Sequence, residues 1–218
     1  MASRSPQKLI NILQLAYSGE LAAAYAYRGH WRSVSDADER ARIEEIENEE
    51  WHHRRLVGEM LQKLGAQPNQ RRERRALVVG RTLGFLCHLT GWLAPMYGAG
   101  RLESRNIREY ETAARYARDC GREDFIDCLL MMAEVEWEHE KYFRSRVLIH
   151  LFGKRLPIWP EPPAKESIRQ KFAHDFTEPS ADRGPQRGSP AGVVDAPDPR
   201  GDFRIQQAIA RDTTGSGE

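Results

Sequence analysis

Two Glu-x-x-His segments are the part of this sequence best suited to chemistry. They are Glu50–His53 and Glu136–His139, and a further glutamate precedes them by 30 residues in the first case and 33 in the second. In an α-helix, residues three apart project from the same face, so a Glu and a His at this spacing can bind one metal ion together. The pattern therefore predicts a site for two metal ions, whose ligands are Glu20, Glu50, His53, Glu103, Glu136 and His139.

The first segment can be read in two registers, because Glu49 and His52 have the same spacing as Glu50 and His53. Helical periodicity separates them. Glu50 and His53 continue the apolar stripe that runs through Ile46, whereas the other pair lies about 100° away from it. We therefore expect Glu50 and His53 to face the bundle interior.

Four amphipathic segments predict long helices at about 5–31, 36–64, 77–118 and 123–151. Every proposed ligand occupies a position on the apolar stripe of its segment. We expect an all-α, ferritin-like four-helix bundle over residues 1–155.

The composition changes after Leu156, where nine of the twelve prolines lie. We expect a C-terminal extension over residues 156–177 and a disordered tail over residues 178–218.

Composition excludes several other classes. Charged residues make up 30% of the chain, yet the net charge is only +1, which gives no reason to expect a nucleic-acid partner. The three cysteines lack Cys-x-x-Cys spacing, which argues against a disulfide framework, a zinc site or an iron–sulfur cluster. The N-terminus lacks the apolar region of a signal peptide, so we expect a cytoplasmic protein.

Mixed carboxylate and imidazole ligation suits two iron ions, with manganese as the alternative. We expect Glu50 and Glu136 to bridge the metals, with Glu20 and His53 on one ion and Glu103 and His139 on the other. Six side chains shared between two ions leave coordination positions where O2 can bind. The sequence has no Gly-rich flavin or nicotinamide motif, so the electron donor must be external.

The third segment contains nineteen residues, 82–100, without a formal charge apart from neutral His88, and the basic run 70–75 precedes it. It is too rich in glycine for a transmembrane helix, and Pro95 interrupts it. One interpretation is that residues 71–100 lie on a membrane surface; the other is an ordinary buried helix after a solvated loop. Small residues at 98–100 and 22–24 predict space for a hydrophobic substrate beside the metals.

Over residues 8–150 the chain resembles the demethoxyubiquinone hydroxylases of the ferritin-like superfamily. The segment 17–20 looks like that family's Ala-Gly-Glu, a glycine-rich third helix leads to Glu103 with Tyr110 seven residues on, and 136–139 is similar to its Glu-Leu-Glu-His. Ser18, the pair Arg108-Glu109 in place of two histidines, and the proline-rich C-terminus depart from the family pattern.

The resemblance implies an oxygen-dependent monooxygenase that hydroxylates a prenylated quinol during ubiquinone biosynthesis, as a peripheral enzyme on the inner face of the membrane. We assign a catalytic role to Tyr110, which shares the ligand stripe with Tyr27; plain core packing is the alternative for both.

A rubrerythrin- or ferritin-like protein that handles iron or peroxide is the second hypothesis. It is weakened by the absence of a Cys-x-x-Cys module, which rubrerythrin typically carries. The oligomeric state stays open between a monomer and a homodimer.

Overall fold

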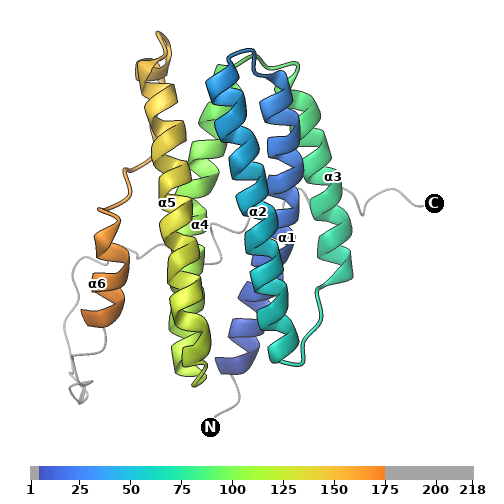
Figure 1. Cartoon of the computed structure of the whole chain (residues 1–218), viewed down its shortest axis with the longest axis vertical. Helices are drawn as coiled ribbons and strands as arrows, with labels where there is room; N and C mark the ends of the chain where they lie inside the picture. The colour runs from blue at the N-terminus through green and yellow to red at the C-terminus, as the bar shows by residue number, and fades with distance from the viewer. Residues whose placement is uncertain (1–4, 175–218) are drawn as a thin grey trace, which may run out of the picture. The chain divides into compact units, whose positions relative to one another are not determined.

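Six α-helices and two short 3₁₀-helices make up residues 5–174, the part of the chain that the computed structural model describes (Figure 1). This confirms the predicted all-α bundle. The elements are α1 (Ser5–Ser33), α2 (Ala37–Lys63), α3 (Gln70–Cys87), α4 (Leu93–Asp119), η1 (Glu123–Phe125), α5 (Ile126–Ile149), η2 (Gly153–Arg155) and α6 (Glu166–His174).

Capping residues fix where the helices begin and end. The side chain of Asp36 accepts a hydrogen bond from the Glu39 amide at 2.9 Å at the start of α2. Asn69 does the same for α3, accepting from the amides of Arg71 and Arg72 at 3.1 and 3.2 Å. These bonds satisfy amide groups that have no partner inside the helix.

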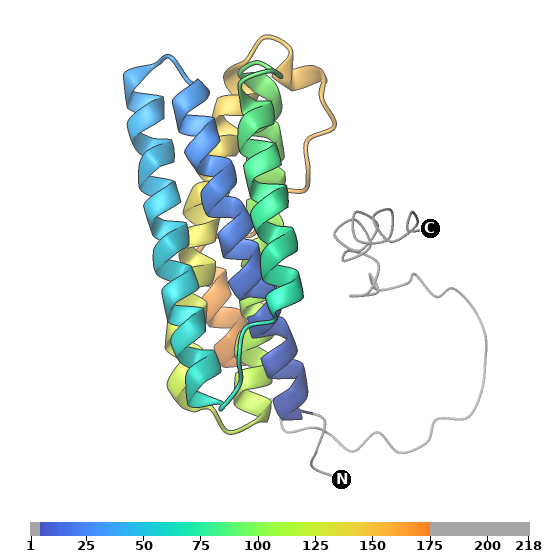
Figure 2. The same cartoon turned by 90° about the vertical axis from the view of Figure 1, so that its right-hand side faces the viewer.

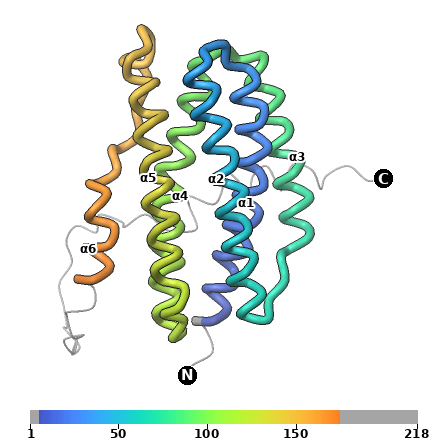
Figure 3. Tube along the Cα trace, in the orientation of Figure 1, coloured from blue at the N-terminus to red at the C-terminus, as the bar shows by residue number. Residues whose placement is uncertain are grey.

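The prediction of one continuous third helix over residues 77–118 is wrong. The chain reverses direction between α3 and α4 (Figure 3). Gly91 has a φ of 73°, a conformation that favours glycine, and Pro95 falls in the first turn of α4, where its missing N–H costs nothing. Apolar periodicity missed this break because residues 82–100, on both sides of it, carry no formal charge. Leu89, in the connection, is 65% exposed.

Glycines let α3 approach α1 closely, so that α1 lies between α2 and α3 (Figure 2). A Cβ at Gly84 would lie 2.7 Å from the Tyr25 carbonyl oxygen and 3.3 Å from the Cα of Gly29. A Cβ at Gly80 would lie 2.8 Å from the Cα of Ala22. The α3 helix is therefore a fifth long helix, packed outside the four that carry the predicted ligands.

The core forms two hydrophobic clusters. One contains Leu9, Leu13, Val57, Tyr110 and Leu129 among others. The other contains Tyr27, Ile43, Met96, Phe143 and Trp159 among others. In each of α1, α2, α4 and α5 the predicted ligands fall between the residues of the two clusters, so the core surrounds them.

The chain continues past α5 along the outside of that helix and ends its described part in α6 (Figure 1). Ile168 and Phe172 of α6 are buried against the first cluster. The predicted tail at 178–218 lies outside the described residues, and the domain boundaries stay predictions.

Cys87, Cys120 and Cys128 are free thiols.

His30 is a buried residue of the second cluster that makes stability depend on pH. Its ring centroid lies 6.4 Å from that of Tyr27 and 5.9 Å from that of Phe143, and its Nε2 has no hydrogen-bond partner within residues 5–174. Burial lowers the pKa of His30 from 6.5 to about 4. The unfolded chain therefore binds a proton first as the pH falls, so this contribution to stability is present above pH 6.5 and is lost between pH 6.5 and 4.

We expect His30 to account for a loss of about 2 kcal/mol in the free energy of unfolding between pH 7 and pH 5. Urea unfolding of the wild type and His30→Phe at both pH values measures this. The loss should be smaller in the variant by about that amount. An equal loss in both proteins would contradict the assignment.

Candidate metal centre

The structure brings all six predicted ligands together inside the bundle. Glu20 comes from α1, Glu50 and His53 from α2, Glu103 from α4, and Glu136 and His139 from α5, and none is more than 4% exposed. One ligand atom from each of Glu20, Glu50, His53 and Glu136 lies within 4.8 Å of the others. The same holds for Glu50, Glu103, Glu136 and His139. Glu50 and Glu136 belong to both groups.

Several polar atoms of this cluster are buried without a hydrogen-bond partner among the described residues. They are both carboxyl oxygens of Glu50, Oε2 of Glu20, Oε2 of Glu136 and Nδ1 of His139. Each unpaired buried polar group costs about 1–3 kcal/mol. These atoms converge, and all of them are electron-pair donors, so the donor set fits a pair of metal ions.

The pKa values of the buried glutamates shift in opposite directions. Burial raises the pKa of Glu20, Glu50 and Glu103, and the charge of Glu136 raises it further. Burial acts in the same direction on Glu136, but the neighbouring rings of His139, at 3.6 Å, and His53, at 3.0 Å, hold the pKa of Glu136 well below its usual range. Without metal, protons therefore neutralise part of the buried negative charge that metal cations would otherwise neutralise. Metal binding must release these protons.

Two tyrosines hold the outer glutamates across the α1–α4 contact. The hydroxyl of Tyr110 donates to Oε1 of Glu20, and the hydroxyl of Tyr27 donates to Oε1 of Glu103. Asn106 Nδ2 also donates to Glu103, at 2.9 Å. Burial and the nearby carboxylates raise the pKa of both tyrosines well above its usual value. Both rings lie in the core, and both hydroxyls bind ligands.

Glu49 is a residue of this centre that periodicity missed. Its Oε2 lies 2.7 Å from Nε2 of His139, while Nδ1 of the same ring faces Glu50 at 3.4 Å and Glu136 at 3.6 Å. Burial lowers the pKa of His139, but Glu136 and Glu49 outweigh it and raise that pKa to about 9. Glu49 thus orients the ring so that Nδ1 points to the cluster.

His52, in contrast, lies on the exposed side of α2, with Nδ1 3.0 Å from Arg55. Glu49 and His52 belong to the same alternative register, and the rotation of α2 relative to α5 decides that only Glu49 reaches His139. The sequence does not give that rotation.

Glu109 is a second acidic side chain near the centre. Burial raises its pKa to about 8, and the charges of Glu20 and Glu136 act in the same direction. It belongs to the Arg108-Glu109 pair that departs from the family pattern, and the stripe gave no reason to place it near the ligands.

The predicted space for substrate beside the metals is not open at Gly100. A Cβ there would meet the indole ring of Trp159, with Cη2 at 2.6 Å, and Cβ of Phe143 at 3.0 Å. Ala22, the small residue of α1, packs against Gly80 of α3. The small residues at these two positions therefore accommodate neighbouring parts of the chain.

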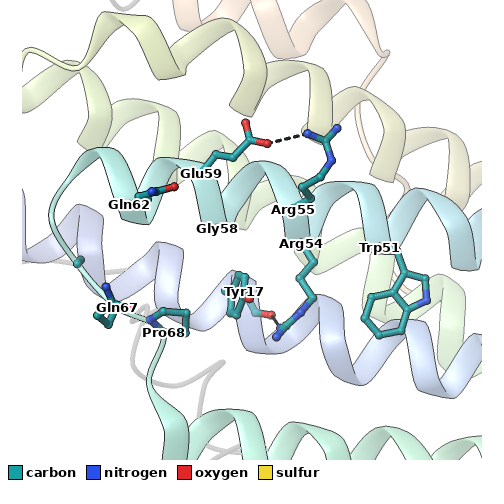
Figure 4. Close-up of a pocket in the computed structure, with 10 residues that line it drawn as sticks. Tyr17, Trp51, Arg54, Arg55, Gly58, Glu59, Gln62, Gln67 and Pro68 are labelled. Atoms are coloured by element: carbon teal, nitrogen blue, oxygen red, sulfur yellow. Dashed lines mark hydrogen bonds and ion pairs between the residues drawn. The ribbon is translucent and has the colours of Figure 1, made fainter.

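A surface groove lies between α1, α2 and the connection that joins α2 to α3 (Figure 4). Arg54 crosses it to the Tyr17 carbonyl oxygen and forms an ion pair with Glu73, and Arg55 binds Glu59 at 2.7 Å. None of the six predicted ligands lines the groove, so it is separate from the metal centre.

Comparison with known families gives one match. The family model described as "Ubiquinone biosynthesis protein COQ7" matches residues 7–142, which is more than half of the chain and includes all six predicted ligands and Tyr110. No curated protein matches the chain, and no solved structure does.

Proposed function

Because the chain belongs to the COQ7 family of ubiquinone biosynthesis proteins, we propose that it is a di-iron monooxygenase. Its substrate is a prenylated quinol, into whose ring it inserts one atom of O2. The second oxygen atom leaves as water, and an external donor supplies two electrons.

One observation carries this proposal: two buried groups of ligand atoms share Glu50 and Glu136. In this arrangement Glu20 and His53 would hold one iron, Glu103 and His139 the other, and the shared glutamates would bridge them. Iron bound in this way supplies the redox chemistry that activates O2. Manganese fits the same donor set.

The protein's own part is to hold these ligands in a dry core and to keep protons at defined atoms. The raised pKa of Tyr110 keeps its hydroxyl protonated at neutral pH, and the proton lies on the bond to Glu20. We propose that Tyr110 is a catalytic residue that keeps this proton and holds the predicted ligand Glu20 by donating a hydrogen bond to it during turnover.

Tyr110→Phe is expected to bind two irons per chain as the wild type does, but to lower kcat by up to about 10²-fold, the upper end of the effect of removing a hydrogen bond that orients a metal ligand. Tyr116→Phe is the matched control, because Tyr116 packs at the edge of the first cluster, beneath Lys8. Metal analysis and steady-state kinetics measure the two quantities. Unchanged kcat in Tyr110→Phe would remove it from the mechanism.

A membrane is the natural source of a prenylated quinol, and α3 has a suitable surface. None of the described helices is both long enough and apolar enough to cross a membrane. Val78, Leu83, Phe85 and Leu86 are nevertheless exposed on α3, and the basic run 71–75 precedes them. We propose that residues 71–100 contact the inner face of a membrane as a peripheral surface.

A cell that lacks demethoxyubiquinone hydroxylation tests the proposal. Expression of this chain should restore ubiquinone, and expression of Glu136→Ala at equal level should not. Accumulation of the demethoxy precursor despite soluble, iron-loaded protein would exclude this substrate.

A further inference from the structure

A segment that follows α5 closes the α4–α5 side of the metal centre. The indole of Trp159 is only 7% exposed and lies against Gly100 of α4 and Phe143 of α5. Gly100 precedes Glu103 by three residues, so the two positions share one face of α4. The indole therefore occupies the volume one turn away from a predicted metal ligand.

Phe143 and Tyr27 connect the Gly100 position to that ligand. Phe143, whose Cβ lies at the same Gly100 position as the indole, stacks on Tyr27 with centroids 5.6 Å apart and planes 5° apart. The Tyr27 hydroxyl donates to Glu103. Trp159 therefore meets, at Gly100, the residues that lead to Glu103.

Buried polar contacts hold Trp159 in place. Its Nε1 donates to Oε1 of Glu140 at 2.6 Å, and Arg144 Nε donates to the same oxygen at 2.6 Å. Arg144 Nη2 also donates to the carbonyl oxygens of Trp159 and Pro160, at 3.1 and 3.0 Å. Glu140 is fully buried and Arg144 nearly so. An ion pair in such a place adds little stability, but it fixes one geometry, here that of the indole.

We propose that Trp159 is a specificity-determining residue of the metal centre. Its indole fills the space at Gly100, one turn from Glu103, that a larger ring substituent of the substrate would need, so the wild type accepts only small substituents on that side. The inference rests on the proposed hydroxylase function. Phe143, Arg144 and Trp159 all lie beyond residues 7–142, so membership of the family does not account for them.

The first experiment asks whether the space exists, using the full chain without metal and indole as the probe. Trp159→Ala should leave an indole-sized cavity in which added indole can donate its N–H to Glu140 as the side chain does, and buried cavities of this size bind small aromatic molecules. Indole should raise the Tm of Trp159→Ala and leave that of the wild type unchanged. Trp137→Ala is the control, because Trp137 donates to the Pro163 carbonyl oxygen at 2.8 Å in the same segment but is not among the groups nearest Gly100. A folded Trp159→Ala that ignores indole would overturn the proposal.

Gly100→Ala provides a second variant if Trp159→Ala does not fold. The added methyl group should destabilise the wild type, because the helix backbone at Gly100 cannot yield and the indole is held. It should destabilise Trp159→Leu much less, and additive effects in this double-mutant cycle would overturn the contact.

The second experiment measures selectivity with iron-loaded protein, O2, an added two-electron reductant and two soluble prenylated quinols that differ only by a methyl or a propyl group on the ring. Trp159→Ala should raise the kcat/KM ratio of the propyl to the methyl compound at least 10-fold, as expected for added methylene groups in an apolar pocket. A wild type that hydroxylates the methyl compound, with an unchanged ratio in the variant, would overturn the specificity role alone. A wild type that hydroxylates neither compound would refute the hydroxylase function itself, and the specificity role with it.

Discussion

Replacing Glu50 by leucine is expected to stabilise the metal-free protein and to abolish binding of the metal pair. Glu50 is fully buried, and neither carboxyl oxygen has a hydrogen-bond partner among the described residues. Burial, together with the charges of Glu20 and Glu136, raises its pKa well above the usual value. A leucine of similar size removes this uncompensated group, so the free energy of unfolding should rise by about 1–3 kcal/mol.

Metal binding should respond in the opposite direction, because Glu50 belongs to both groups of ligand atoms and its loss removes a donor from each ion. Urea unfolding without metal and iron(II) titration under anaerobic conditions give the two results. Glu45→Leu is the control, since Glu45 lies on the exposed side of α2 and pairs with Arg42. A variant that is less stable and still binds two irons would contradict the role of Glu50.

Glu49→Ala is expected to lower iron affinity by about 10–100-fold, the usual effect of removing a partner that orients a metal-binding histidine. His139 would keep Nδ1 near the cluster but would lose the bond at Nε2 that fixes its ring. Titration of iron(II) against a competing chelator measures the change.

His52→Ala is the matched control for Glu49→Ala, because His52 shares the alternative Glu-x-x-His register and contacts only Arg55 among the described hydrogen bonds. We expect no change in iron affinity. Equal effects of the two substitutions would show that Glu49 does not act through His139.

Periodicity was sufficient to predict that six side chains meet inside the bundle. A carboxylate is costly in a core, so a glutamate that continues an apolar stripe indicates a compensating partner, and this reasoning selected Glu50 and His53 over the neighbouring register. The structure brings all six side chains into two overlapping groups that share Glu50 and Glu136.

Features that depend on how the helices are rotated and paired could not be predicted from the sequence. The partnership of Glu49 and His139 requires the rotation of α2 relative to α5, which periodicity does not give. The break at 88–92 was hidden because the residues on both sides of it, 82–87 and 93–100, carry no formal charge. The Gly80–Ala22 contact requires knowledge of which helix α3 packs against.

Trp159 was hidden for a different reason. Its segment is rich in proline, and such a composition predicts an irregular extension without saying where it docks. The docking follows from Glu140 and Arg144, which lie on α5 beside the ligands and read as ordinary charged helix residues. The contact between Trp159 and Gly100 explains why the small residues at 98–100 do not leave open space beside the predicted ligands.

We propose above all that a metal pair in this bundle directs O2 to a prenylated quinol. The most direct test loads the wild-type chain with iron(II) without oxygen, adds a prenylated quinol that lacks the ring hydroxyl, admits ¹⁸O-labelled O2, and measures the product by mass spectrometry. We predict a product that has gained one labelled oxygen atom, and none with Glu50→Leu. Consumption of O2 or added peroxide with no oxygen transferred to the quinol would contradict the claim and favour a protein that handles iron or peroxide.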